Sequence, residues 1–294
     1  MEYKVDLDNI RLDNYLTSAL LESRSQVTKM IKSKEVLVNG KVTKTGFILK
    51  KGDIIDVNHV KEDNSITPEK MDLDIVYEDD DVIVVNKANG VVVHPAPGNY
   101  HSTLVNGLLY HTKLSDLNGD VRPGIVHRID AYTTGLLMIA KNNKAHASLA
   151  GDLALKKTYR KYVALVWGVI NNDSGTIDAP IGRDLKDRKK MAVISNGKNA
   201  VTHFKVLKRF KNATLIELKL ETGRTHQIRV HMDYIGHSVV NDPVYGNRKL
   251  IDETGQCLHA KVLGFNHPTT HKYMEFESPL PKCFINILNK FEGE

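Results

Sequence analysis

The stretch Gly124-Ile-Val-His-Arg-Ile-Asp-Ala-Tyr-Thr-Thr-Gly-Leu-Leu137 carries a single carboxylate, Asp130. A Pro-Gly turn precedes it, and the apolar run 136–140 that follows is typical of a buried strand, so Asp130 is expected in a tight, glycine-flanked loop. A carboxylate in such a loop can act as a nucleophile or as a base. It can equally cap a turn or pair with the neighbouring Arg128, because Asp is common in turns. The rest of the sequence must decide between these interpretations.

The composition narrows the class of protein. A chain of 294 residues can bury a substantial core in one or two domains, and a formal net charge of +6 predicts a polyanionic partner if the charge is clustered. The two cysteines, Cys257 and Cys283, do not form a Cys-x-x-Cys motif, which argues against a disulfide framework or a structural zinc site. The N-terminus lacks the apolar core of a signal peptide, and no apolar run could span a membrane. We therefore expect a soluble, cytoplasmic protein.

Residues 1–58 are expected to form a small α/β module. Apolar residues recur at helical spacing after Arg11, and Ser25 can cap a second helix. Asn39-Gly40 is a strong signal for a type I′ hairpin turn. Basic residues crowd the module's second half, namely Arg24, Lys29, Lys32, Lys34, Lys41, Lys44, Lys50 and Lys51, with Glu35 as the only acid among them. Such clustering is typical of a phosphate-binding surface, although it can also be a solvated face.

A polar segment of mixed charge, 59–72, is expected to be a linker. Beyond it, residues 73–294 contain many strand-like runs and few helical patterns, which predicts an α+β domain with a mixed, mainly antiparallel sheet. The expected strands are 73–77, 82–86, 90–93, 136–140, 159–166, 201–207 and 214–220, and the expected helices are 103–111, 143–155 and 225–234.

Several motifs in order resemble one known family. The run from His127 to Leu137 resembles the HRLD-x-x-T-S-G-L-L active-site motif of the RluA/RluD-type pseudouridine synthases. The segment 161–168 is similar to their Y-x-A-L-V-x-G strand, 222–231 to their G-R-T-H-Q-I-R-x-H motif, and 181–193 to a basic segment of the same catalytic domain. The N-terminal module resembles the S4 RNA-binding domain. One departure is Ala131-Tyr132, where the family often has a charged pair, and it leaves substrate specificity open.

The resemblance implies an isomerase reaction in which the N-glycosidic bond of a uridine in RNA breaks and the base rejoins through C5. No redox or phosphoryl-transfer step is involved, so neither a cofactor nor a metal is expected. In agreement, the sequence has no GxxxxGK[ST] loop and no HExxH helix. Asp130 would attack C1′ as a nucleophile or remove the C2′ proton. The sequence leaves both routes open.

Two further catalytic residues are implied by the resemblance. Arg229 would hold the Asp130 carboxylate in its ionised form, which burial alone disfavours. Tyr162 would stack on the flipped uracil. From the residues alone, Arg229 could instead pair with Asp233 one helical turn away, and Tyr162 could be a core residue.

RNA is the expected partner, with ribosomal RNA of the large subunit favoured by the resemblance. The target nucleotide should be flipped out of its stack. The residues expected to bind substrate or RNA are His127, Arg128, Arg24, Lys29, Lys32, Arg183, Arg188, Lys189, Lys190, Arg224 and His226. His127 could alternatively be a core histidine. We expect a monomer that grips RNA with both domains.

Two other classes of function compete with this one. A non-catalytic, S4-containing RNA-binding or ribosome-assembly protein should have lost the acid, whereas Asp130, Tyr162 and Arg229 are all present. A glycosidase normally needs two carboxylates flanking the bond, and the motif supplies one. The same isomerisation acting on tRNA or on another rRNA stays open. Metal binding by the histidines is disfavoured, because no histidine pair has ligand spacing with a nearby cysteine or carboxylate.

Overall fold

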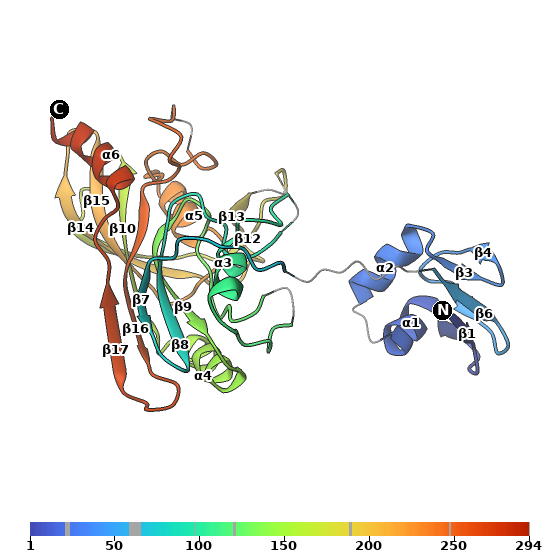
Figure 1. Ribbon diagram of the computed structural model, residues 1–294. Helices are drawn as coiled ribbons and strands as arrows, with labels where there is room; N and C mark the ends of the chain where they lie inside the picture. Colours follow the sequence, from blue (N-terminus) through green and yellow to red (C-terminus); the bar gives the residue numbers. More distant parts are fainter. Residues whose placement is uncertain are drawn as a thin grey trace. The chain divides into compact units, whose positions relative to one another are not determined.

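The computed structural model describes residues 1–20, 24–58, 66–96, 98–119, 122–187, 190–246 and 248–293. The chain divides into two compact units, Met1–Asp63 and Asn64–Glu294 (Figure 1). No described helix is both long enough and apolar enough to cross a membrane.

The first unit packs two helices against small antiparallel sheets. Its elements are β1 (Glu2–Lys4), β2 (Ile10–Arg11), α1 (Leu12–Leu20), α2 (Arg24–Lys32), β3 (Val36–Val38), β4 (Lys41–Val42), β5 (Ile48–Leu49) and β6 (Ile54–Val57). The strands run in the order β1-β6-β3-β4, and β2 pairs with β5. Asn39 and Gly40 connect β3 to β4 with φ of 50° and 73°, which confirms the predicted hairpin turn. The side chain of Ser25, expected to cap α2, lies outside the described part of the structure.

The second unit is built on one large sheet. Its strands are β7 (Ile75–Glu78), β8 (Val82–Lys87), β9 (Thr134–Ala140), β10 (Tyr159–Trp167), β11 (Ser174–Asp178), β12 (Ile181–Arg183), β13 (Met191–Val193), β14 (Val201–Arg209), β15 (Ala213–Leu220), β16 (Leu258–Asn266) and β17 (Tyr273–Glu277). Its helices are α3 (Leu104–His111), α4 (Asn143–Ala154), α5 (Gln227–Tyr234) and α6 (Lys282–Glu292).

The large sheet is mixed and mainly antiparallel, which confirms the predicted fold class. The strand order is β11-β14-β15-β10-β16-β9-β8-β7, and β17 pairs with β16. Among the strand pairs that the structure describes, only β9 and β16 run parallel; the others are antiparallel. Strands β12 and β13 form a separate hairpin.

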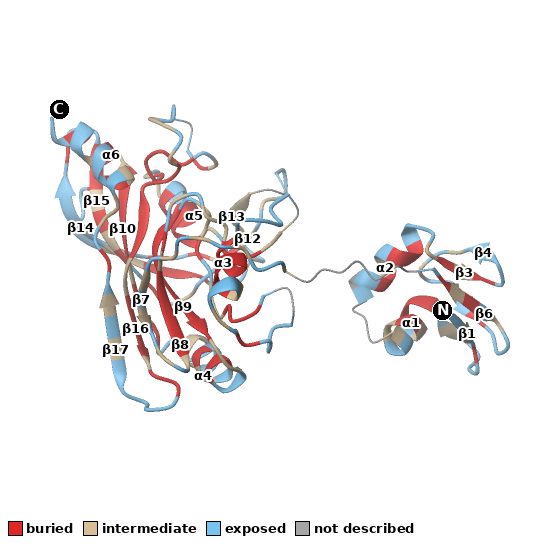
Figure 2. Ribbon diagram, viewed as in Figure 1, coloured by how far each residue is buried: buried red, intermediate tan, exposed pale blue. Residues whose placement is uncertain are grey.

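Both faces of the central strands are buried, as Figure 2 shows for β8, β9 and β10. On β9, Leu137 and Ile139 face one core, whereas Leu136 and Met138 face another that includes α4. This alternation follows from the two-residue period of a strand. On β10 the same rule directs Tyr162 into the first core, which α5 also covers. The two catalytic candidates on β10 and α5 therefore share one side of the sheet.

Two expectations about the chain path differ from the structure. The run 90–93 does not form a strand, because the carbonyls of Val92 and Val93 accept hydrogen bonds from the first amides of α3, at 2.8 and 3.1 Å. Residues 66–72 of the predicted linker belong to the second unit. There Glu69 donates its amide to the Asn106 carbonyl at 3.0 Å.

Candidate active site

The loop that carries Asp130 is fixed by its neighbours on both sides. The backbone carbonyl of Asp130 accepts a hydrogen bond from the amide of Thr133 at 3.0 Å, which closes a turn. Lys87, at the end of β8 and 2% exposed, donates from Nζ to the carbonyls of Ala131 and Ala88 at 2.7 and 2.8 Å. Burial lowers the pKa of Lys87 to about 7, although the nearby Asp130 opposes the shift. The backbone next to Asp130 is thus held by a buried amine.

Gly135 places the loop against the sheet. Its φ is +107°, and a Cβ atom here would lie 2.2 Å from the carbonyl oxygen of Ala260. Only glycine accommodates both the conformation and the close approach. The glycine of the predicted motif therefore allows β9 to begin its parallel pairing with β16 directly after the Asp130 loop.

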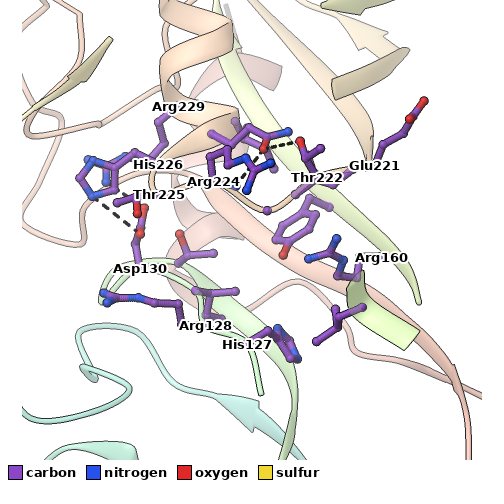
Figure 3. Close-up of a pocket in the computed structure, with 18 of the residues that line it drawn as sticks. His127, Arg128, Asp130, Arg160, Glu221, Thr222, Arg224, Thr225, His226 and Arg229 are labelled. Atoms are coloured by element: carbon purple, nitrogen blue, oxygen red, sulfur yellow. Dashed lines mark hydrogen bonds and ion pairs between the residues drawn. The ribbon is translucent and has the colours of Figure 1, made fainter. Parts of the chain in front are cut away.

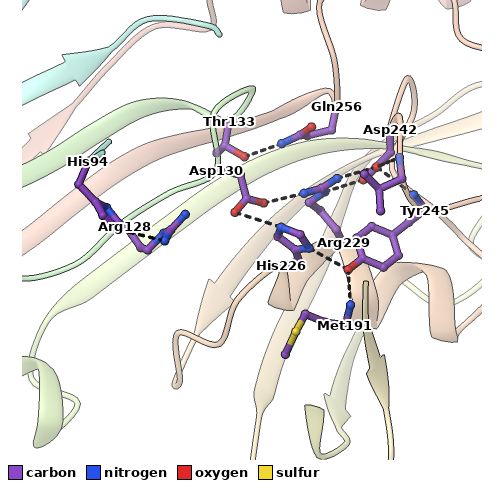
Figure 4. A network of polar contacts seen from close by, with 11 residues as sticks. His94, Arg128, Asp130, Thr133, Met191, His226, Arg229, Asp242, Tyr245 and Gln256 are labelled. Atoms are coloured by element: carbon purple, nitrogen blue, oxygen red, sulfur yellow. Dashed lines mark hydrogen bonds and ion pairs between the residues drawn. The ribbon is translucent and has the colours of Figure 1, made fainter. Parts of the chain in front are cut away.

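The Asp130 carboxylate pairs with Arg229 of α5, whose Nη1 lies 2.9 Å from Oδ2 of Asp130. The rest of the guanidinium binds Asp242, with Nε 2.7 Å from Oδ2 and Nη2 2.8 Å from Oδ1 (Figure 4). Burial lowers the pKa of Arg229, but its hydrogen bonds and charge interactions with Asp242 and Asp130 outweigh burial and raise it. Two alternative pairs were open from the sequence, Arg229 with Asp233 and Asp130 with Arg128. In the structure Arg229 pairs instead with Asp130 and Asp242.

A second chain of contacts reaches Asp130 from the β12–β13 hairpin. The amide of Met191 donates to the Tyr245 hydroxyl at 2.9 Å, and that hydroxyl lies 2.8 Å from Nδ1 of His226. Because Nε2 faces the Asp130 carboxylate, we assign the imidazole proton to Nε2 and the hydroxyl proton of Tyr245 to the bond with Nδ1. Nε2 lies 3.8 Å from Oδ1 of Asp130. Burial lowers the pKa of His226, which favours its neutral form.

Asp130, His226 and Arg229 border a cavity of about 430 Å³ (Figure 3). The loop around Asp130, strand β10, the 220–226 segment and the start of α5 line it. Tyr162 forms part of the wall and is only 6% exposed, and burial raises the pKa of its hydroxyl. The volume is typical of a site for a small ligand or a single nucleoside. The structure therefore brings Asp130, Tyr162 and Arg229 into one pocket.

Four of the residues expected to contact RNA also line this pocket: His127, Arg128, Arg224 and His226. The His127 ring accepts the amide of Met138 at 3.2 Å, and burial, with Arg160 nearby, lowers its pKa to about 3. Arg128 is exposed, and its Nη1 lies 3.4 Å from Nε2 of His94.

The other expected RNA contacts lie outside the pocket. Lys29 and Lys32 are exposed on α2. Arg24 forms an ion pair with Asp13, with Nη2 3.1 Å from Oδ2. Arg183 ends β12 on the surface, and Lys190, next to β13, is half-buried. Arg188 and Lys189 fall outside the described residues.

Sequence reasoning missed four residues of the site: Asp242, Tyr245, Arg160 and, as a support of the loop, Lys87. None of them belongs to the motif segments that resemble the family, although Arg160 stands one residue before the segment 161–168. No spacing rule links Asp242 to Arg229, because a loop beyond α5 supplies it.

Comparisons with known proteins match this chain to a family. The RNA pseudouridylate synthase family matches residues 81–234, and the S4 domain matches residues 10–55. The chain belongs to the RNA pseudouridylate synthase family. It is 57% identical over 281 residues to an uncharacterized RNA pseudouridine synthase of Bacillus subtilis (strain 168), covering 95% of this chain and 93% of that protein.

Two other pseudouridine synthases are similar over most of their length. Ribosomal large subunit pseudouridine synthase D of Pseudomonas aeruginosa is 42% identical over 303 residues, covering 98% of this chain and 94% of that protein. The solved structure of Human RNA Pseudouridylate Synthase Domain Containing 1 covers 76% of this chain and 96% of its own, with a TM-score of 0.60 and 26% identity. The chain is thus an RNA pseudouridine synthase with an S4 domain.

Proposed function

We propose that this pseudouridine synthase isomerises one or more uridines of large-subunit ribosomal RNA, with Asp130 as its catalytic carboxylate. The observation that carries the assignment of the site is the 2.9 Å contact between Asp130 and Arg229 inside a pocket that also contains Tyr162. The support for the RNA is the similarity to proteins named ribosomal large subunit pseudouridine synthase D, 42% identical in Pseudomonas aeruginosa.

In this proposal the two oxygens of Asp130 have different tasks. Oδ2 is bound to Arg229, whereas among the described residues Oδ1 has only the more distant Nε2 of His226 beside it, at 3.8 Å. Oδ1 is therefore the oxygen that reaches the ribose, either at C1′ or at the C2′ proton. Tyr162 provides an aromatic wall on which the detached uracil stacks while it turns.

RNA is proposed to be held at two places. Exposed Lys29 and Lys32 of α2 offer phosphate contacts on the S4 domain, and Arg183 with Lys190 offers others on the catalytic domain. Arg128 is exposed at the pocket and is proposed to enter the space that the flipped nucleotide leaves. A ribosomal substrate would place the enzyme in the cytoplasm. We propose that it acts as a monomer, since Asp130, Tyr162 and Arg229 converge within one chain.

Tritium release from RNA labelled at C5 of uridine tests the chemistry. The wild-type enzyme should release tritium from large-subunit RNA, and Asp130→Asn should release none while its RNA affinity stays nearly unchanged. Retained turnover in Asp130→Asn would refute the role of Asp130.

Carbodiimide mapping of uridines in total RNA from a deletion strain tests the substrate. Loss of signal in large-subunit RNA, restored by the wild-type gene and not by Asp130→Asn, is expected. Loss confined to tRNA or to another rRNA would refute the proposed substrate and leave the reaction intact.

A further inference from the structure

Arg160 of β10 carries a buried positive charge that the described part of the protein does not neutralise. The residue is 9% exposed, and its Nε has no hydrogen-bond partner. Neither a hydrogen bond nor an ion pair joins its guanidinium to any residue that the structure describes. An isolated buried charge is costly, so a buried arginine is normally paired.

The acidic groups of the same pocket are already engaged. Asp130 binds Arg229, at 2.9 Å. Glu221 has Lys156 at 2.9 Å and His203 at 2.8 Å. No described acid that lines the pocket is therefore paired with Arg160.

The guanidinium is aimed into the catalytic pocket. Arg160 and Tyr162 are two residues apart on one strand, so they lie on the same face of the sheet, and both line the cavity. Figure 3 shows Arg160 on the side of the pocket where His127 also lies. A Cβ at Gly223 would lie 2.9 Å from Nη1 of Arg160, so the missing side chain at that position leaves room for the guanidinium.

We propose that Arg160 binds a phosphate of the substrate RNA next to the target uridine. This inference rests on the proposed function, in which the pocket takes up a flipped nucleotide. Uracil is neutral, whereas each phosphodiester brings one negative charge, and the planar fork of a guanidinium binds phosphate oxygens in pairs. Because Tyr162 is the proposed platform for the base, the phosphate flanking that nucleotide is the anion nearest to Arg160.

Salt-dependent binding tests the proposal without any turnover. The probe is a transcript containing the uridine identified by the mapping described above, bound to wild-type enzyme, Arg160→Gln and Arg160→Lys. Arg160→Gln should weaken binding roughly tenfold to a hundredfold. It should also reduce the slope of log K against log salt by about 0.7 to 0.9, the value for one phosphate. Arg160→Lys should keep the slope and lose part of the affinity.

Lys208→Gln is the matched control for net charge. Lys208 is exposed and paired with Glu292 at 2.6 Å outside the pocket, so its removal should leave the slope unchanged. An unchanged slope in Arg160→Gln, or an equal change in Lys208→Gln, would overturn the proposal.

Thermal unfolding separates a binding role from a structural one. If the charge of Arg160 is kept for a ligand, Arg160→Gln should unfold at the same temperature as the wild type or higher. A clearly lower Tm in both Arg160→Gln and Arg160→Lys would assign Arg160 to folding and overturn the proposal.

A transcript with a neutral methylphosphonate beside the target uridine identifies the partner. On this RNA Arg160→Gln should bind as well as the wild type, because the negative phosphate charge that Arg160 is proposed to bind is absent. A persistent loss would mean that Arg160 recognises the base, against the proposal. Since these are binding measurements, they keep their meaning even if Asp130→Asn were to retain activity.

Discussion

Asp242 lies behind Arg229 and accepts hydrogen bonds from both Nε and Nη2 of its guanidinium, at 2.7 and 2.8 Å. It also accepts the amides of Val244 and Tyr245, at 2.8 and 3.0 Å. With Nε and Nη2 bound to Asp242, Nη1 is the nitrogen that donates to Asp130. The direction in which Arg229 approaches the Asp130 carboxylate is therefore set by a second acid in the loop after α5.

We predict that Asp242→Asn lowers kcat at least tenfold and changes the KM for RNA little. The amide cannot accept both guanidinium bonds, so Arg229 loses its fixed orientation toward Asp130. The free energy of unfolding should fall by about 1.5–3 kcal/mol, the usual value of a hydrogen bond to a charged group. Tritium release and urea unfolding measure the two effects.

Asp173→Asn is the control for this prediction. Asp173 is 90% exposed in its ion pair with Arg209, and exposed pairs contribute little. Equal effects of the two substitutions on kcat and on the free energy of unfolding would contradict the claim that Asp242 orients Arg229 toward Asp130.

We predict that Tyr245→Phe changes the tautomer of His226. The ring and its contact with Arg229 stay, and the hydroxyl is lost, which bonds Nδ1 and accepts the Met191 amide. Nitrogen-15 chemical shifts of the resting enzyme should show the His226 proton on Nε2 in the wild type and a mixture of tautomers in the variant. Burial raises the pKa of Tyr245 to about 12, so its proton is present at neutral pH.

The same substitution should lower kcat about tenfold, the effect of one neutral hydrogen bond, with little change in KM. Tyr273→Phe is the control, since it removes a hydroxyl bonded to Glu275 on β17, outside the pocket. If His226 had the same nitrogen shifts in wild type and Tyr245→Phe, the assigned hydrogen-bond direction would be wrong.

We predict that Lys29→Glu combined with Lys32→Glu weakens RNA binding by about tenfold or more at moderate salt, because two phosphate contacts become repulsive. At saturating RNA the kcat should match the wild type, since both residues lie in the S4 domain. Lys4→Glu, on β1 of the same compact unit, tests whether any charge reversal there has this effect. Comparable losses from Lys4→Glu would argue against a binding surface centred on α2.

We predict that the protein loses stability between pH 6.5 and pH 4. Burial lowers the pKa of His259 from 6.5 to about 4, and the pKa values of His94 and His127 shift in the same direction. In this window the unfolded chain binds protons that the folded protein does not, so the free energy of unfolding falls with the pH. The loss is roughly 2 kcal/mol for each such histidine.

Urea unfolding at pH 7 and pH 4.5 measures this loss. His259→Gln should reduce it, whereas His271→Asn, at an exposed position, should not. An identical loss in His259→Gln and in the wild type would remove His259 from the explanation.

The sequence predicted the parts of the site that lie on recognisable motifs. Asp130, Tyr162 and Arg229 meet in one pocket, as the motifs implied. Their supports were not predictable, because they come from contacts distant in sequence. Lys87 reaches across to Ala131, 44 residues away, and Asp242 is held by a loop whose composition carries no signal.

The fold was predictable to a similar extent. Strong apolar runs gave β8, β9, β10, β14 and β15, and the turn at Asn39-Gly40 gave the first hairpin. Strands β16 and β17 were not predicted, because charged and small residues interrupt their apolar pattern, as in Leu258–Asn266. The run 90–93, which was predicted to be a strand, shows the limit of such patterns. Its carbonyls accept hydrogen bonds from the first amides of α3 instead of pairing in a sheet.

The amine of Lys87 has a consequence for the conditions in which the enzyme can work. Its pKa is about 7, so near neutral pH the group exists with and without its third proton. It contacts two carbonyls, those of Ala88 and Ala131, and a neutral amine still has two N–H donors for them. The tether on the Asp130 loop therefore survives the loss of the charge. A cell whose internal pH drifts through neutrality would keep the same loop geometry throughout.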